Sequence, residues 1–259
     1  FVLADKGDET SGLITSLMGT SKGDFAFATD INTLFIDRDG DGTLNSDDWK
    51  IQLTGLTTFH DDDIDLYVTV GTGGDTLTGG DGDDSLTGNS GADSLTGDGG
   101  NDTIGHGSNG ANTIKGGAGD DSITGGTGAD SLYGGSTNSD TTGTGNDTIA
   151  TGGGADTVYG GDGNDSITGG AAAESLYGQL GNDTITGAAG ADSLYGGGGN
   201  DTITDAAGAS SIEGGAGNDS LTGGADADTI KGGDGNDTVA GDAAADSLYG
   251  DDGDDVITS

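Results

Sequence analysis

The residues with the clearest capacity for chemistry are acidic side chains that recur at a fixed spacing along most of the chain. From Leu77 onward, Asp followed by Ser or Thr and then an aliphatic residue recurs mainly in steps of nine. The chain has 46 acidic and 6 basic residues, a formal net charge of -40. Carboxylates at this density require cations, and Ca2+ accepts many oxygen ligands. The same charge excludes nucleic acid as a partner and argues against anionic membranes.

The acidic positions belong to two kinds of turn that alternate along the chain. In every second turn, Asn or Asp stands immediately before the repeat Asp; these turns form the Asn row. The intervening turns mostly have Ala there and form the Ala row. The Asn row predicts ten metal ligands: Asp84, Asp102, Asp121, Asp147, Asp165, Asp183, Asp201, Asp219, Asp237 and Asp255. The Ala row adds Asp93, Asp130 and Asp156. Past about residue 160 the Ala row loses glycines or the acid itself, so we expect calcium to fill it only partly, mainly before that point.

The elements between these turns must be short strands. With 59 Gly, no Pro, no Cys and 29% hydrophobic residues, the chain is too poor in large apolar side chains to fold by burial alone. A three-residue unit with an apolar centre predicts a strand with one buried residue, and the Gly-rich segments predict turns. Two nonapeptides then make one coil of about 18 residues. About ten coils would stack into a rod of roughly 48 Å, at about 4.8 Å per strand.

Twenty aliphatic residues are predicted to fill the core of this rod: Leu77, Leu86, Leu95, Ile104, Ile114, Ile123, Leu132, Ile149, Val158, Ile167, Leu176, Ile185, Leu194, Ile203, Ile212, Leu221, Ile230, Val239, Leu248 and Ile257. Two steps depart from nine. One is a step of ten after Ile104, and the other is a step of seventeen after Leu132. The longer step predicts an exposed loop insertion near 136–145.

Three segments carry a resemblance to a known family: 79–86 (GGDGDDSL), 160–167 (GGDGNDSI) and 232–239 (GGDGNDTV). They resemble the GGxGxDxUx repeat of the RTX (repeats-in-toxin) family, and the resemblance covers about residues 71–259. It implies an all-β, right-handed parallel β-roll, with sixth-position carboxylates and turn carbonyls as calcium ligands. It also implies secretion by the type I route. The chain opens on Phe1 with no visible signal peptide, so we expect it to be a piece of a longer protein.

Residues 1–70 differ in composition and predict a small, separate β module. Segment 37–48 (DRDGDGTLNSDD) matches the spacing of calcium ligands in an EF-hand loop. Its predicted ligands are Asp37, Asp39, Asp41, Thr43 and Asp48. The flanking residues 34–36 and 51–53 predict strands rather than helices, and the segment resembles modules that cap or separate RTX rolls. An unliganded acidic hairpin turn is the alternative.

The two histidines give no indication of a metal or catalytic site. His60 and His106 lack partners at metal or triad spacing, so we predict surface positions for both. No catalytic constellation is present and no stretch is long enough to cross a membrane, so neither enzymatic activity nor membrane insertion is expected.

Five tyrosines each follow the aliphatic residue after an Ala-row turn and predict a ladder on one flat face: Tyr133, Tyr159, Tyr177, Tyr195 and Tyr249. The ladder either stiffens the sheet or docks copies of the chain or other surface components.

Three functions fit these patterns. The first is a calcium-binding structural segment of a large secreted or cell-surface protein, such as an S-layer, filament or adhesin. The second is the carboxyl-terminal secretion and folding domain of a type I secreted hydrolase or toxin. The third is ice binding, because units such as 184–186 (TIT) would place rows of Thr on a flat face. The first is favoured because a cap-like module precedes the roll.

Overall fold

The computed structural model describes residues 73–107, 109–135 and 145–259, together with the backbone of four earlier strands. These strands are β1 (Phe25–Asp30), β2 (Thr33–Asp37), β3 (Trp49–Leu53) and β4 (Leu66–Thr69). They pair in sequence order as antiparallel neighbours. The strands predicted on either side of segment 37–48 are therefore confirmed. The loop itself, residues 38–48, and His60 lie outside the described residues, so the calcium loop stays a prediction.

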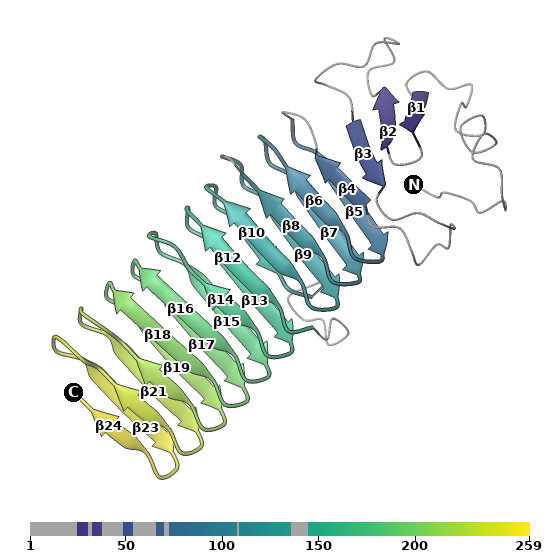
Figure 1. Cartoon of the computed structure of the whole chain (residues 1–259). Coiled ribbons are helices and arrows are strands. Elements are labelled where there is room, and N and C mark those ends of the chain that lie inside the picture. The colour runs from purple at the N-terminus through teal and green to yellow at the C-terminus, as the bar shows by residue number, and fades with distance from the viewer. Residues whose placement is uncertain are drawn as a thin grey trace.

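From β4 onward the chain winds as a parallel β-solenoid (Figure 1). One sheet has 14 strands and continues β4 with the even-numbered strands: β6 (Ser85–Gly88), β8 (Thr103–His106), β10 (Ser122–Gly126), β12 (Thr148–Gly152), β14 (Ser166–Thr168), β16 (Thr184–Ala189), β18 (Thr202–Ala207), β20 (Ser220–Thr222), β22 (Thr238–Ala240) and β24 (Val256–Thr258). The turns of the Asn row lead into these strands.

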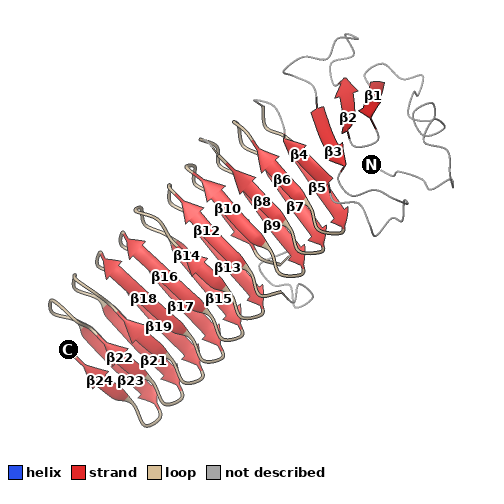
Figure 2. Ribbon diagram, in the orientation of Figure 1, coloured by secondary structure: helices blue, strands red, loops and turns tan. Residues whose placement is uncertain are grey.

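The second sheet has ten strands, all odd-numbered: β5 (Thr76–Asp81), β7 (Ser94–Gly99), β9 (Thr113–Ala118), β11 (Ser131–Tyr133), β13 (Thr157–Asp162), β15 (Ser175–Leu180), β17 (Ser193–Gly198), β19 (Ser211–Ala216), β21 (Thr229–Asp234) and β23 (Ser247–Asp252). Figure 2 shows strands and tan turns alternating along the rod. The predicted coil of roughly 18 residues is confirmed. Most strands of this sheet are longer than the predicted three residues, because the turn glycines continue the pairing, as Gly80 does with Asp98.

The interior of the rod is a single file of aliphatic side chains from each sheet. Eighteen of the twenty predicted core residues, from Leu77 to Val239, are at most 5% exposed. Leu248 is partly buried against them, and Ile257 in the last coil is 46% exposed. Equivalent residues of neighbouring coils pair with each other, as Ile167 does with Ile185. Each such side chain contributes about 1.5–3 kcal/mol of burial, which is little for the length of chain that each coil must order.

The long step in the repeat does not disturb the stack. Ser122 of β10 pairs with Thr148 of β12, and Ser131 of β11 pairs with Thr157 of β13. In the turn before β12, Asp121 bonds to Asp147 across 26 residues, whereas the regular partners Asp165 and Asp183 are 18 residues apart. The extra residues therefore leave the register intact. Residues 136–144 of the predicted loop lie outside the described part of the chain.

The predicted tyrosine ladder is confirmed for four of its five members. Tyr133, Tyr159, Tyr177 and Tyr195 stack in order, with ring centroids 5.4, 4.9 and 4.7 Å apart and interplanar angles of 12°, 9° and 4°. Tyr249 lies further along the row, because Glu213 and Lys231 occupy the intervening positions. Stacked rings cover each other's faces, which supports a contribution to sheet stiffness.

Candidate metal sites in the turns

The sixth-position aspartates of the Asn row point into the rod instead of outward. In all but the last coil they are 1–3% exposed, and Asp255 is half-buried. One carboxylate oxygen, Oδ1, accepts a hydrogen bond from the backbone N–H of the equivalent Asp one coil earlier. Asp165 donates to Asp183 at 2.8 Å, and Asp183 donates to Asp201 at 2.8 Å. The sequence predicted these residues as ligands but not this cap ladder, which ties each coil to the one before it.

The second oxygen, Oδ2, has no hydrogen-bond donor in seven Asn-row turns: Asp102, Asp121, Asp165, Asp183, Asp201, Asp219 and Asp237. Around Asp183, this oxygen faces the backbone of the following coil. A Cβ built on Gly178 would clash with Asp183 Oδ2 and lie 2.7 Å from the carbonyl oxygen of Gly196. Two acceptor oxygens therefore share one small buried space. Buried acceptors without a donor are costly, and a cation between them reverses the sign of the interaction.

The same arrangement recurs in nine turns of the Asn row, at the first-position glycines Gly79, Gly97, Gly116, Gly134, Gly160, Gly178, Gly196, Gly214 and Gly232. The facing carbonyl retains acceptor capacity even where it already accepts one bond, as Gly134 O does from the N–H of Gly117. Among the described residues, no three His, Cys, Asp or Glu side chains gather to hold a metal by themselves. A mixed set of carboxylate and carbonyl oxygens fits Ca2+, which accepts six to eight oxygens, and does not fit zinc.

Replacing a first-position glycine is expected to disrupt its turn. We expect Gly178→Ala to destabilise the calcium-bound chain by about 1–3 kcal/mol, because its Cβ collides with the Asp183 carboxylate. Gly105→Ala is the matched control, since a Cβ there meets nothing within 4 Å. Thermal unfolding in calcium measures both. Equal midpoints for the two variants would show that the space beside Asp183 is not tightly used.

Burial of these carboxylates raises their pKa values. Desolvation is the largest cause, and it raises the pKa of Asp121, Asp165 and Asp183 to about 7. The pKa values of Asp102, Asp147 and Asp219 rise to about 6 for the same reason. The N–H donated by the preceding coil lowers each pKa and offsets part of the rise. In the folded roll without calcium, these six carboxyl groups therefore keep their protons to a higher pH than they would at their ordinary pKa values.

Calcium-free protein is expected to lose stability as pH rises. A carboxyl group with a raised folded-state pKa binds more protons folded than unfolded, so its contribution is largest below pH 4 and is lost as pH rises through about 6 to 7. Thermal unfolding in calcium-free buffer, with osmolyte added to restore a folded population, should give a higher midpoint at pH 5 than at pH 8. Saturating calcium should remove or reverse this trend, because the ion competes with the proton. A calcium-free chain that is more stable at pH 8 would contradict the assignment.

A second ladder runs outside the first in the Asn row. The fifth-position side chain accepts a hydrogen bond from the backbone N–H of the equivalent residue one coil later. Asn182 donates to Asn164 Oδ1 at 2.7 Å, and Asn200 donates to Asn182 Oδ1 at 2.6 Å. The outer ladder points in the opposite direction to the cap ladder. The Ala side chain has no acceptor atom, so this outer ladder cannot form at the fifth positions of the Ala row that hold Ala.

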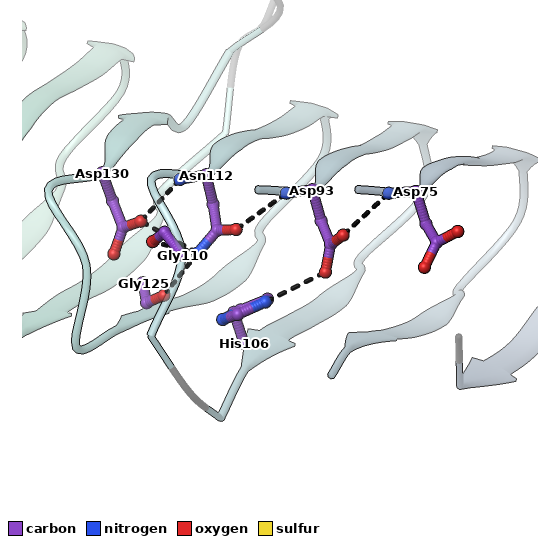
Figure 3. A network of polar contacts seen from close by, with 7 residues as sticks. All are labelled: Asp75, Asp93, His106, Gly110, Asn112, Gly125 and Asp130. Atoms are coloured by element: carbon purple, nitrogen blue, oxygen red, sulfur yellow. Dashed lines mark hydrogen bonds and ion pairs between the residues drawn. The ribbon is translucent and has the colours of Figure 1, made fainter. Parts of the chain in front are cut away.

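At the start of the Ala row, the side chains of His106 and Asn112 contact buried carboxylate oxygens (Figure 3). His106 occupies the first position of its turn and is 3% exposed, so the prediction of a surface position was wrong. Its imidazole lies beside Gly88 of the preceding coil, where a Cβ would clash with the ring. Nε2 lies 2.9 Å from Asp93 Oδ2, and Asp93 Oδ1 accepts the N–H of Asp75 at 2.8 Å. Asp93 was predicted as a calcium ligand, and an ion there would have to displace the imidazole.

Asn112 replaces Asp at the sixth position of the next turn. Its Oδ1 accepts the N–H of Asp93 at 2.9 Å, as a cap Asp would. Its Nδ2 donates to Gly110 O at 3.1 Å, to Gly125 O at 3.4 Å and to Asp130 Oδ1 at 2.9 Å (Figure 3). The Asn112 amide therefore donates to carbonyl and carboxylate oxygens. In the Asn row, equivalent oxygens lie together and the carboxylate oxygen has no donor. The Asn112 amide therefore supplies here the positive partner that we expect a cation to supply in the Asn row.

Asp130 and Asp156 are the other predicted Ala-row ligands; Asp130 keeps the regular arrangement, whereas the turn of Asp156 has Thr151 in place of the first-position glycine. Asp130 donates its N–H to Asp156 Oδ1 at 2.7 Å. A Cβ on Gly125 would lie 2.9 Å from Asp130 Oδ2 and 2.6 Å from Thr151 O, so a carboxylate again faces a carbonyl of the next coil. Burial raises the pKa of both carboxyl groups.

These features define a class of protein: a parallel β-solenoid whose glycine-rich turns bring carboxylate and carbonyl oxygens together for calcium. The chain belongs to the RTX calcium-binding nonapeptide repeat family, which matches residues 69–104, 106–139, 141–173, 168–203, 195–230, 204–239 and 231–259. Proteins with these repeats bind calcium and are typically secreted by the type I route. No curated protein matches the chain. Within the described residues there is no helix long and apolar enough to cross a membrane.

Proposed function

We propose that this chain is a structural segment of a large secreted or cell-surface protein, which folds into a rod where calcium is abundant and serves binding and support rather than catalysis. The observation that carries the proposal is the uninterrupted Asn row. Buried Oδ2 atoms without a donor recur from Asp102 to Asp237, and the cap and outer ladders continue through the stack. Each recurring type of repeat position, whether glycine, Asn, Asp or aliphatic, has a role in holding neighbouring coils together.

The location of the parent protein tests this function. Antibodies raised against the roll should detect the parent in the cell-surface fraction of the producing cells, and a calcium chelator should release it into the medium. A parent found free in the medium at millimolar calcium, attached to a hydrolase or toxin, would contradict the proposal. That result would favour the alternative role as a carboxyl-terminal secretion and folding domain.

Copies of the chain are the partner that the tyrosine ladder suits. Calcium would neutralise much of the charge that keeps rods apart, and the ring edges of the stacked tyrosines lie on one sheet face. We expect calcium-dependent association that weakens when Tyr159, Tyr177 and Tyr195 are all changed to Ser. Tyr249→Ser, outside the stack, should associate as the unmodified chain does. Light scattering across a calcium titration reports particle mass. Monomers at millimolar calcium, or equal association of the triple variant, would show that the ladder only stiffens the sheet.

A further inference from the structure

One Ala-row turn, residues 205–210, rearranges the chemistry of the repeat. Its sixth position is Ser210 instead of an acid, and its first position is Asp205 instead of Gly. Both side chains are buried, with Asp205 only 2% exposed. Every first position of the Asn row is Gly, since a Cβ there would strike the carboxylate of the same turn. A carboxylate at this place is therefore a marked departure from the repeat.

Ser210 and Asp205 divide between them the two roles of a sixth-position Asp. Ser210 Oγ accepts the N–H of Asp192 at 3.0 Å, which is the role of Oδ1 in the cap ladder. The same hydroxyl donates to Asp205 Oδ2 at 2.8 Å and holds that carboxyl group in place. Asp205 Oδ1 is then left buried without a donor, as Oδ2 is in the Asn row. The turn has moved its carboxylate without losing it.

The moved carboxylate faces the acid of the preceding coil. Asp192 Oδ2 and Asp205 Oδ1 each lie 2.8 Å from the point where a Gly187 side chain would begin. Asp192 is also 2% exposed, and its Oδ2 has no donor. The pairing of β16 with β18 is irregular here, with Ala188 opposite Asp205, and such an irregularity re-aims a side chain. Two acceptors therefore point into one buried space.

Glu174 is the buried acid one coil earlier in the same row. Its side chain is 2% exposed, and neither carboxylate oxygen has a donor. A Cβ on Gly169 would lie 3.2 Å from Glu174 Oε2 and 2.6 Å from Gly187 O, so Glu174 faces the carbonyl of Gly187. The Glu174 carboxylate therefore lies beside the Gly187 carbonyl oxygen, whereas the Asp192 and Asp205 carboxylates share the space where a Gly187 side chain would begin.

The beginning of the same row provides the contrast. His106 holds the same first position as Asp205, and each faces the sixth-position acid of the preceding Ala-row turn. His106 places an N–H on Asp93 Oδ2, which satisfies that oxygen. Asp205 places an oxygen beside Asp192 Oδ2, which satisfies neither. Only a positive charge or a shared proton makes the second arrangement stable.

We propose that the carboxylates of Asp192 and Asp205 hold an additional calcium ion in the part of the Ala row that departs most from the repeat. This inference rests on the proposed calcium-dependent fold and deepens it. The loss of the sixth-position acid at Ser210 led us to expect little calcium in this half of the row. Relocation of the carboxylate to Asp205 restores the oxygen set that calcium prefers.

Counting bound calcium in three variants tests the site. Asp205→Gly removes the carboxylate and restores a regular first position. The double variant Asp205→Gly, Ser210→Asp differs from it by one residue and returns the acid to the sixth position. Asp226→Asn, an exposed acid of the same row, controls for the change in charge. Equilibrium dialysis of the full chain against radioactive calcium gives ions per chain, and the calcium dependence of the thermal midpoint gives an independent measure.

We expect Asp205→Gly to bind about one ion fewer than the unmodified chain, with a weaker calcium dependence of its midpoint. The double variant and Asp226→Asn should both match the unmodified chain. Equal calcium counts in all four proteins would overturn the site and would mean that a proton is shared among the carboxyl groups instead. An unmodified chain that binds no calcium would overturn the proposed fold-on-binding function itself, so the two failures are distinguishable.

Discussion

Removal of calcium is expected to unfold the roll into an expanded chain. Nine Asn-row turns aim a buried carboxylate at a carbonyl of the next coil, and neutral pH favours ionisation of these groups once the chain unfolds. One aliphatic side chain per nonapeptide is too little apolar burial to hold these groups together, and the net charge of -40 opposes compaction. We expect calcium to bind the folded turns and not the open chain, so that its binding free energy becomes folding free energy.

Circular dichroism and X-ray scattering measure this loss. In excess chelator at pH 8 the β signal should largely disappear, and the radius of gyration should approach the roughly 56 Å of an unfolded chain of this length. Magnesium at the same ionic strength is the control, and it should fail to restore the fold because it demands small, regular octahedral sites. Full β signal in chelator would contradict the account.

A single Asp→Asn substitution in the Asn row is expected to have opposite effects with and without calcium. In Asp183→Asn, the amide oxygen can still accept the N–H of Asp165, so the cap ladder survives. The new Nδ2 can donate to the facing carbonyl, as Asn112 does naturally in the Ala row. The substitution also removes a buried carboxyl whose pKa desolvation raises to about 7. Calcium loses a charged ligand at the same time.

In calcium-free buffer at pH 8, where any residual folded population is measured with added osmolyte, Asp183→Asn should stabilise the roll by about 1–3 kcal/mol. In saturating calcium it should destabilise the roll by a similar amount. Asp234→Asn, an exposed acid, is the matched control and should change little in either buffer. Denaturant titrations of the three proteins under both conditions measure the effect. The same sign in both buffers would show that Asp183 does not act as a calcium ligand.

The sequence was sufficient for the coil, the core and the two rows, because each rests on a strict period. Leu86 and Ile104 recur at fixed steps, and a buried residue every nine positions permits few other folds. The direction of the sixth-position carboxylates was not predictable in the same way. Their N–H partners lie one coil earlier, as Asp165 does for Asp183, and only the stacked coils bring them together.

The departures from the repeat were the residues that sequence reasoning missed. His106 and Asp205 looked like isolated substitutions because their partners, Asp93 and Asp192, lie in the preceding turn of the same row and are distant in the chain. In the stacked coils, His106 and Asp205 each occupy a first position, and each side chain points at the acid of the preceding turn of the row. A first-position residue other than Gly is the sequence signal that these two residues share. Asn112 could have been found similarly, as the one amide at a sixth position of the described turns.

Calcium is expected to lie between the Oδ2 atom of an Asn-row Asp and the carbonyl oxygen of the first-position glycine in the next coil, in the nine turns that have this geometry. Crystals grown in millimolar calcium and measured at long wavelength would locate the ions directly by anomalous scattering. We expect a row of peaks between pairs of atoms such as Asp183 Oδ2 and Gly196 O, repeating at about 4.8 Å along the rod. A folded rod with no anomalous peaks in the Asn row would contradict it.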